Sequence, residues 1–161
     1  MEKKPHTIGT VTFDQIRSKM PHTGRALLIQ EDVIVALGDN MLPVGGTTCF
    51  TPNANHCSGH FPGYPVCPAH ILVELAAQLL GVVAYGPTLW LAPAQEDGPS
   101  VPFFRGLGEA TFRLIATPEH ILVLTAEITS MRSALVVGNV KIECTGKKKV
   151  ADIKGIRIAP K

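Results

Sequence analysis

Residues 55–85 carry the strongest structural signal in the chain and read NHCSGHFPGYPVCPAHILVELAAQLLGVVAY. The first part, Asn55–Pro68, holds three prolines and two glycines, which predicts an ordered loop without helix or strand. Pro68 suits the first position of a helix, because its missing N–H would be unpaired there in any case. We therefore predict a helix from about Pro68 to Val83, which ends before Gly86-Pro87.

The predicted helix is apolar on nearly all sides, which is typical of a helix buried in a core. Two polar residues, Glu74 and Gln78, are spaced one helical turn apart and so share one face. Desolvation of a buried carboxylate would raise its pKa and leave Glu74 protonated near neutral pH, as a proton donor. The residues alone fit another interpretation equally well, in which Glu74 is only structural and makes its hydrogen bonds to Gln78 and a buried water.

His60 precedes Glu74, in a proline-stiffened loop that leads into the helix. A loop histidine is usually a packing or surface residue, but a histidine and a carboxylic acid on opposite sides of one pocket form a base and an acid. The unpaired N–H groups of the first helical turn would polarise a carbonyl oxygen, and Ala69 is the best placed to supply one. Base, acid and carbonyl anchor together favour proton removal next to a carbonyl, coupled to loss of a hydroxyl.

The chain has 161 residues, of which 45% are hydrophobic and 17% charged, so we expect one folded domain over residues 1–161. A net charge of +2 and 6% aromatic residues do not indicate a nucleic-acid binder, and Lys147–Lys149 is interpreted as a solvated turn. The most apolar run, Ile71–Tyr85, is too short to span a bilayer, so we expect no membrane insertion. The N-terminus lacks the pattern of a secretory signal, which favours four reduced cysteines and a cytoplasmic location.

Outside residues 55–85 the sequence predicts one short helix, Thr12–Lys19, capped by Thr12 and with Phe13 and Ile16 facing inward. Apolar, β-branched segments predict strands, which are Leu27–Leu37, Val44–Asn53, Arg105–Ala116, Ile121–Met131, Ser133–Glu143 and Ala151–Ile158. The segment Gly86–Pro102 is rich in proline and glycine and is predicted to be a surface excursion. Short turns between successive strands imply antiparallel pairing, so we expect an α+β fold whose antiparallel sheet wraps the long helix.

Two segments of the chain resemble a family signature. Gly59–Ala69 and Val73–Gln78 are similar to the motifs of hotdog-fold 3-hydroxyacyl-[acyl-carrier-protein] dehydratases of the FabZ type, in the FabA/FabZ family. In that family GHFPGxPVMPG is followed by E-A-x-A-Q at the same His-to-Glu spacing. Weaker similarity links Met20–His22 and Leu27–Ile29 to the family motif LPHRxPxLLVD, and Phe112-Arg113 with Pro118 to its RF…PGD strand and turn.

The resemblance implies a hotdog fold and a hydro-lyase. Such an enzyme converts a (3R)-3-hydroxyacyl thioester on acyl carrier protein to the trans-2-enoyl thioester, in fatty acid or related lipid or polyketide biosynthesis. By motif position, His60 is the base at C2, and Glu74, from the other subunit of a homodimer, protonates the leaving 3-hydroxyl. The Ala69 N–H holds the thioester carbonyl, the Val66 carbonyl orients the histidine ring, and Gln78 steadies the carboxyl group. Because the sister FabA type carries Asp at the position of Glu74, we expect dehydration without isomerisation.

The same resemblance implies no cofactor, because the substrate is carried on the phosphopantetheine arm of acyl carrier protein. That acidic partner would meet basic residues such as Arg105, Arg113 and Arg132. The homodimer can assemble further into a trimer of dimers. Ala69 and His70 stand at the mouth of the acyl tunnel, where the family has Gly and a small apolar residue, so we expect them to bind substrate and tune acyl-chain length.

Two alternatives stay open. Cys57 with His60, and Cys67 with His70, form two C-x2-H pairs at a spacing that zinc also uses, and His60 would then be a ligand. Alternatively, the chain is an acyl-thioester hydrolase or a non-catalytic acyl-thioester-binding hotdog protein, because a fold does not fix a function. Metal analysis tests the first alternative, and detection of an enoyl product or a free thiol tests the second.

Overall fold

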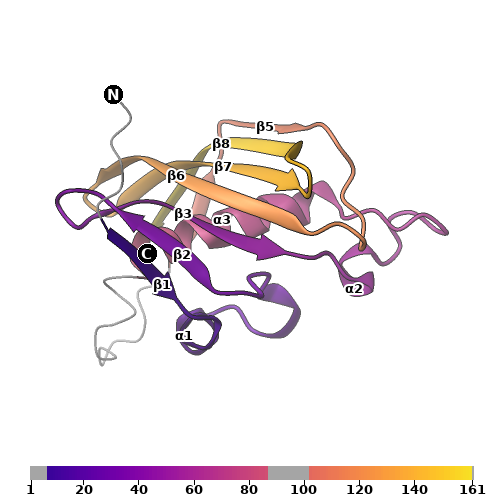
Figure 1. The fold of residues 1–161 in the computed structure, drawn as a ribbon, viewed down its shortest axis with the longest axis horizontal. Helices are drawn as coiled ribbons and strands as arrows, with labels where there is room; N and C mark the ends of the chain where they lie inside the picture. Colours follow the sequence, from indigo (N-terminus) through magenta and orange to yellow (C-terminus); the bar gives the residue numbers. More distant parts are fainter. Residues whose placement is uncertain (1–6, 87–101, 161) are drawn as a thin grey trace.

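The computed structural model describes residues 7–86 and 102–160 (Figure 1). The N-terminal part contains β1 (Thr7–Val11), α1 (Phe13–Lys19), the 3-10 turn η1 (Gly24–Ala26), β2 (Val33–Leu37), β3 (Pro43–Phe50), α2 (Ala54–Cys57) and the long helix α3 (Ala69–Tyr85). The C-terminal part contains β4 (Pro102–Gly106), β5 (Glu109–Phe112), β6 (Leu122–Arg132), β7 (Leu135–Cys144) and β8 (Lys148–Pro160). No helix within these two ranges is long and apolar enough to cross a membrane.

Within the described residues, eight strands form one antiparallel sheet in the order β1-β2-β3-β6-β7-β8-β4, and β5 also pairs with β8. The sheet curves around α3, which packs against β2, β3, β6, β7 and β8 (Figure 1). This is the α+β hotdog architecture, so the prediction of an antiparallel sheet wrapped around one long helix is confirmed.

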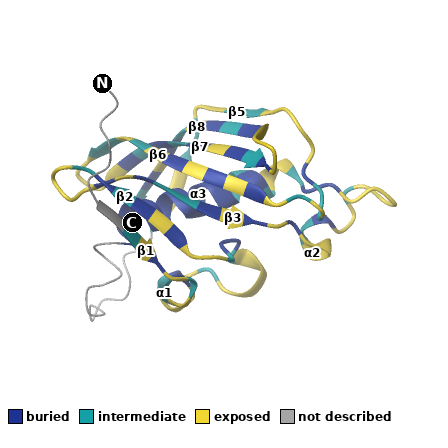
Figure 2. Cartoon of the chain, viewed as in Figure 1, coloured by how far each residue is buried: buried dark blue, intermediate teal, exposed yellow. Residues whose placement is uncertain are grey.

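The core lies between α3 and the sheet (Figure 2). Every residue of α3 from Leu75 to Tyr85 is buried. Along Leu122–Glu127 of β6, buried and exposed residues alternate, as expected for a strand with one face on the core. The first turn of α3 is less covered, and both Ala69 and His70 are exposed. Leu72 of the same turn is buried, and so are Cys57 and Cys67 in the preceding segment. The surface at this end of α3 is therefore formed by Ala69, His70 and the exposed residues of the loop.

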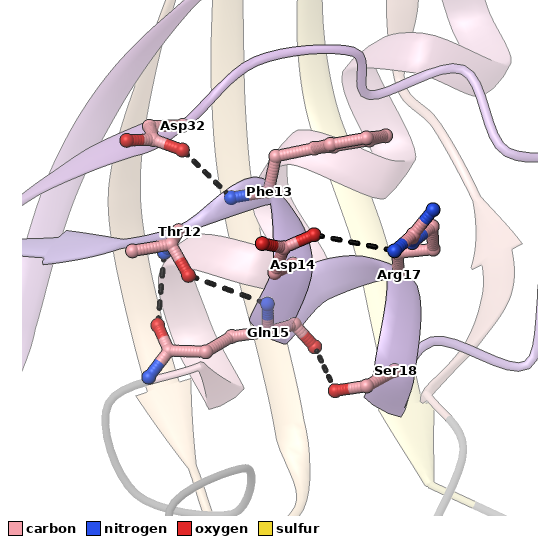
Figure 3. A network of polar contacts seen from close by, with 7 residues as sticks. All are labelled: Thr12, Phe13, Asp14, Gln15, Arg17, Ser18 and Asp32. Carbon is pink, nitrogen blue, oxygen red and sulfur yellow. Dashed lines mark hydrogen bonds and ion pairs between the residues drawn. The ribbon is translucent and has the colours of Figure 1, made fainter.

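The start of α1 is fixed by a capping box and by Asp32 (Figure 3). The Thr12 hydroxyl accepts from the Gln15 backbone N–H, and the Gln15 side chain accepts from the Thr12 N–H. Asp32 accepts from the Phe13 N–H at 2.7 Å, which ties the helix to the residue just before β2. Ile16 is fully buried and Phe13 is half-buried. The predicted helix and its Thr12 cap are therefore confirmed.

The predicted strand Leu27–Leu37 is too long, because β2 begins only at Val33. Leu28 and Ile29 are buried in the core without belonging to a strand. The backbone N–H of Leu28 donates to Gln78 Oε1 at 2.8 Å and so does not enter a strand ladder. A side chain of α3 thus satisfies backbone that the sequence pattern assigns to a strand.

The predicted strand Arg105–Ala116 divides into β4 and β5. Both pair with β8, but the register shifts between Phe104 and Gly106. Four further predicted strands are present, with ends that differ from the prediction by a few residues; they are β3, β6, β7 and β8. The sequence pattern does not predict β1. Of the predicted surface excursion Gly86–Pro102, residues 87–101 lie outside the described residues.

The predicted loop Asn55–Pro68 contains a short helix, so the expectation of no helix there is wrong. The Asn53 side chain accepts from the backbone N–H groups of Asn55 and His56 and so starts α2, in a stretch without proline or glycine. Pro68 is the N-cap of α3 rather than its first helical residue, and α3 extends beyond Val83 to Tyr85.

Two glycines allow α3 to lie close to the sheet. A Cβ at Gly46 of β3 would lie 2.5 Å from Val83 Cγ2, and one at Gly138 of β7 would lie 2.5 Å from Leu80 Cδ1. Each would also meet a backbone carbonyl oxygen of the neighbouring strand at 2.7 Å. Helix and sheet therefore meet at a distance that leaves no room for a methyl group at either position.

We predict that Gly138→Ala lowers the free energy of unfolding by about 1–3 kcal/mol, because the added methyl must displace Leu80 or separate β6 from β7. Urea unfolding followed by circular dichroism measures the change. Gly9→Ala is the matched control, because a Cβ at Gly9 of β1 meets nothing within 4 Å. An equal effect of the two substitutions would contradict the close approach of α3 to the sheet.

Candidate active site

His60 lies in a loop whose shape is held by its own backbone hydrogen bonds. The His60 N–H donates to the Cys57 carbonyl at 3.0 Å, and the Val66 N–H donates to the His60 carbonyl at 2.7 Å. Two further hydrogen bonds join the backbones of Phe61 and Tyr64 at the tip, where both aromatic rings are exposed. The loop therefore presents His60 from a defined backbone.

One ring nitrogen of His60 is held by the loop and the other is free. Nδ1 lies 3.0 Å from the Val66 carbonyl oxygen, which can only accept, so Nδ1 carries the hydrogen. Nε2 then has an available lone pair and no hydrogen-bond partner among the described residues. The predicted contact of the Val66 carbonyl with the ring is confirmed, and it leaves Nε2 able to take up a proton.

The start of α3 follows this loop directly. The Cys67 N–H donates to the Ala116 carbonyl at 2.7 Å, which fixes the chain just before the helix. Pro68 supplies no side-chain cap, and the first turn holds no acidic residue. Within residues 7–86 and 102–160, the backbone N–H groups of Ala69 and His70 have no hydrogen-bond partner. Exposed N–H groups at the positive end of a helix can bind an oxygen atom, as predicted for a carbonyl anchor.

Glu74 lies about one turn further along α3, and its side chain is 45% exposed in the single chain rather than buried as predicted. Oε1 accepts from Gln78 Nε2 at 2.9 Å and lies 3.3 Å from His22 Nε2. The hydrogen bond from His22 is the main influence that holds the pKa of Glu74 below its usual value. Burial raises this pKa, and the hydrogen bond from Gln78 lowers it further. The prediction of a raised pKa is therefore wrong for the single chain, because the sequence pattern does not bring His22 next to Glu74.

Gln78 joins α3 to the segment before β2 through both ends of its amide. The side chain is buried; Oε1 accepts from the Leu28 N–H at 2.8 Å, and Nε2 donates to the Ala26 carbonyl at 2.7 Å. The second hydrogen of Nε2 is the one that reaches Glu74. The predicted contact between Gln78 and Glu74 is confirmed, and the same amide anchors the chain around η1 to the helix.

Within the described part of the chain, no hydrogen bond or ion pair joins His60 to Glu74. One chain thus assembles His60 with Val66, and Glu74 with Gln78 and His22, as two separate groups. The N-terminal end of α3, which carries Glu74, points toward α2 and the loop that follows it (Figure 1).

Cys57 and Cys67 lie side by side rather than in two metal-binding pairs. Both are buried free thiols in hydrogen-bond contact with one another. Burial, with Cys57 nearby, raises the pKa of Cys67 to about 12, so this thiol stays protonated at neutral pH. Across residues 7–86 and 102–160, no group of three or more His, Cys, Asp or Glu side chains is arranged to hold a metal ion. The zinc alternative therefore has no ligand set in this part of the chain.

A comparison with protein families matches residues 27–154 to the FabA-like domain. The chain belongs to the FabA-like family. Relatives of this FabA-like chain are named 3-hydroxyacyl-[acyl-carrier-protein] dehydratase FabZ. The protein from Streptococcus thermophilus is 31% identical over 138 residues, which cover 86% of this chain and 90% of the relative. The protein from Streptococcus equi subsp. zooepidemicus is 32% identical over 133 residues, which cover 83% and 87%. The resemblance to the FabZ type is therefore confirmed.

Solved structures share the fold of this FabA-like chain. The dehydratase heterocomplex ApeI:P from Xenorhabdus doucetiae matches with a TM-score of 0.67 and 14% identity, over 94% of this chain and 91% of that one. The E. coli PaaI protein from the phenylacetic acid degradation operon matches with a TM-score of 0.54 and 18% identity, over 72% and 76%. At these identities the likeness establishes the hotdog fold alone.

His22 is the site residue that the sequence pattern does not identify. It lies far from Glu74 in the chain, and a lone loop histidine gives no sign of its partner. The signal that points to it is its place in Met20–His22, the segment that resembles a motif of the FabA/FabZ family. Only the packing of this segment against α3 shows that the histidine reaches the carboxyl group.

We predict that Gln78→Leu lowers the free energy of unfolding by roughly 1–3 kcal/mol, because it leaves the buried N–H of Leu28 without a partner. Urea unfolding measures the effect. Gln30→Leu is the control, because Gln30 is half-buried and its side chain makes no hydrogen bond among the described residues. If the two variants are equally stable, Gln78 does not anchor the segment before β2.

Proposed function

We propose that the protein dehydrates a (3R)-3-hydroxyacyl thioester on acyl carrier protein to the trans-2-enoyl thioester, in fatty acid or related lipid or polyketide biosynthesis. The observation that carries the proposal is the state of His60, whose Nδ1 is held by Val66 while Nε2 is free to act as a base. The N–H of Ala69, which has no hydrogen-bond partner among the described residues, follows this loop directly and is available to a thioester carbonyl. Family membership and relatives named as this dehydratase support the proposal.

The reaction removes one water molecule through two proton transfers. His60 Nε2 takes the proton from C2, while the Ala69 N–H stabilises the negative charge that develops on the carbonyl oxygen. The electron pair of the C2–H bond forms the C2=C3 double bond, and the bond from C3 to the hydroxyl oxygen breaks. Glu74 gives its proton to that oxygen, which leaves as water. His60 then loses its proton to solvent and Glu74 regains one, so the starting state returns.

Four residues bind substrate or support the catalytic pair in this proposal. The Val66 carbonyl orients the catalytic histidine, and Gln78 holds the catalytic carboxyl group. Ala69 retains the backbone N–H but adds a methyl where the family has glycine. His70, exposed beside it, adds an imidazole at the mouth of the acyl tunnel. We expect Ala69 and His70 to set the acyl-chain length, and the scheme uses no cofactor beyond the phosphopantetheine of the carrier.

Acyl carrier protein is the partner that this function requires, and its acidic surface favours basic contacts. Arg105, Arg113 and Arg132 are exposed and suited to that role. Arg113 Nε lies 3.5 Å from Asp152 Oδ2, so part of its charge is already compensated within the chain. Arg105 and Arg132 are therefore the stronger candidates for contact with the carrier.

A homodimer completes the site in this proposal, because Glu74 is half exposed and does not meet His60 within the described chain. A second copy over α3 would remove water from the carboxyl group and raise its pKa toward the range in which it donates a proton. The β4 edge of the sheet and the adjoining β5 suit such pairing, because the exposed apolar residues there include Phe103, Phe104 and Phe112. A trimer of dimers is a further assembly that the family resemblance implies.

We predict that His60→Ala and Glu74→Gln each reduce kcat by roughly 10²–10⁴-fold, because each removes one proton-transfer group. The assay follows the enoyl product from 3-hydroxyacyl thioesters of acyl carrier protein. Mixing the two inactive variants should restore activity, because a heterodimer contains one intact pair when His60 and Glu74 come from different subunits.

Near-full turnover by both variants on every acyl chain would exclude these residues from catalysis. Release of a free thiol without an enoyl product would support an acyl-thioester hydrolase instead. Binding of the thioester with neither product would support the non-catalytic alternative. One assay that measures absorbance of the enoyl thioester and free thiol together distinguishes dehydration from hydrolysis, and a separate measurement of thioester binding tests the non-catalytic alternative.

We predict that the protein is a dimer at micromolar concentration, and that Phe104→Lys and Phe112→Lys each shift it toward monomer. A lysine at the β4–β5 edge would be buried without a partner in the dimer, which costs free energy. Light scattering measures the mass. Leu42→Lys is the matched control, because Leu42 is 45% exposed and Phe104 46%, but Leu42 lies between β2 and β3. A wild-type monomer with full activity would rule out the shared site.

A further inference from the structure

His22 contacts Glu74 from a segment that the proposed reaction does not otherwise use. It lies between α1 and η1, two residues after Met20, the buried C-cap of α1. Nε2 lies 3.3 Å from Glu74 Oε1. Nδ1 is buried and has no hydrogen-bond partner among the described residues. The ring thus has one engaged nitrogen and one unpaired nitrogen.

These contacts define where the imidazole carries its hydrogen. An ionised carboxylate only accepts hydrogen bonds, so Nε2 carries the hydrogen that points toward Oε1 of Glu74. A second hydrogen on Nδ1 would be a buried donor without a partner, which is unfavourable. His22 therefore acts toward Glu74 as an N–H donor through Nε2, and Nδ1 is the nitrogen without a partner among the described residues.

Both N–H donors reach the same oxygen of Glu74. Oε1 lies 2.9 Å from Gln78 Nε2 and 3.3 Å from His22 Nε2, whereas Oε2 has no hydrogen-bond partner within residues 7–86 and 102–160. An oxygen whose two lone pairs accept two N–H groups has none left to bind the acid proton. When Glu74 is protonated, its proton therefore belongs on Oε2.

We propose that His22 is a positioning residue for Glu74, which together with Gln78 occupies Oε1 and so assigns the transferable proton to Oε2. The proposal rests on the function proposed above, in which Glu74 protonates the leaving hydroxyl. His22 touches no reacting atom in this scheme and acts only through the carboxyl group. Its backbone is held near α3, because the Ala26 carbonyl and Leu28 N–H of the same segment are bound to Gln78.

Few groups influence the charge of Glu74. On α3 the polar neighbour is Gln78, and from the segment after α1 the titratable neighbour is His22. Among the described residues, no lysine or arginine forms an ion pair with Glu74. Removal of the His22 donor is therefore expected to show directly in the titration of the Glu74 carboxyl group.

Three substitutions separate the N–H donor from the volume of the ring. His22→Leu removes the donor but keeps an apolar side chain of comparable size. His22→Gln carries an amide N–H that can replace the imidazole N–H. His120→Leu is the matched control, because it removes a histidine whose ring contacts Thr117 in a turn and makes no contact with Glu74.

The kinetic test uses 3-hydroxyacyl thioesters of acyl carrier protein. We expect His22→Leu to reduce kcat by about 10- to 100-fold with little change in KM, because the lost hydrogen bond holds the proton donor and not the bound substrate. His22→Gln should keep most of the wild-type kcat, and His120→Leu should keep all of it. Equal losses in His22→Leu and His22→Gln would overturn the proposal, because the ring volume and not the donor would then matter.

Titration of the Glu74 carboxyl carbon by NMR tests the contact without any activity. In His22→Leu the pKa of Glu74 should rise, because the main influence that lowers it is gone, and in His22→Gln it should stay near the wild-type value. An unchanged titration in His22→Leu overturns the proposal even where dehydration is observed. If His22→Leu does not fold, His22→Phe provides the same comparison, because it keeps a ring without an N–H.

The two readouts distinguish failure of this proposal from failure of the proposed function. If the wild-type protein dehydrates no 3-hydroxyacyl thioester, the proposed function fails, and with it the role of His22 in proton delivery. If the pKa of Glu74 shifts in His22→Leu but not in His22→Gln, with a matching difference in kcat between the two variants, the result supports both the proposed function and the role of His22. A wild-type enzyme that is active and insensitive to His22→Leu retains the function and excludes His22 as a positioning residue.

Discussion

Close packing of α3 against the inside of the sheet is the contact on which the rest of the structure depends. Gly46 and Gly138 let β3 and β7 approach Val83 and Leu80, so the C-terminal turns of the helix are enclosed. In the N-terminal turn Leu72 is still buried, but Ala69 is exposed and its N–H has no hydrogen-bond partner among the described residues. The same packing therefore buries the apolar part of α3 and places its reactive end at the boundary of the molecule.

Buried polar groups next to α3 need partners, and Gln78 meets this requirement on the side of the helix that faces η1. Its amide satisfies the backbone of Ala26 and Leu28 and still has one hydrogen for Glu74. The segment that carries His22 is held against the helix by these bonds. One buried amide thus links the core of the fold to the carboxyl group that the proposed reaction uses.

Opposing influences act on the proton affinity of Glu74. N–H donors from His22 and Gln78 favour the carboxylate, while removal from water favours the neutral acid. In the single chain the donors dominate, because the side chain keeps much of its contact with water. A subunit that covers this face changes the balance without altering the hydrogen bonds, so assembly and acidity of Glu74 are coupled in the proposed enzyme.

Local sequence determined the helices α1 and α3, the β-rich C-terminal half, and two contacts of the site, because these features depend on residues close together in the chain. The ring of His60 reaches the Val66 carbonyl across one short loop, and Gln78 reaches Glu74 across one helical turn. Only the tertiary structure decided the contact of His22 with Glu74, the capture of the Leu28 N–H by a helix side chain, and the lowered pKa of Glu74. Each of these depends on a group that folding brings in from a distant segment. The spacing of residues along the chain does not show which distant segments come into contact.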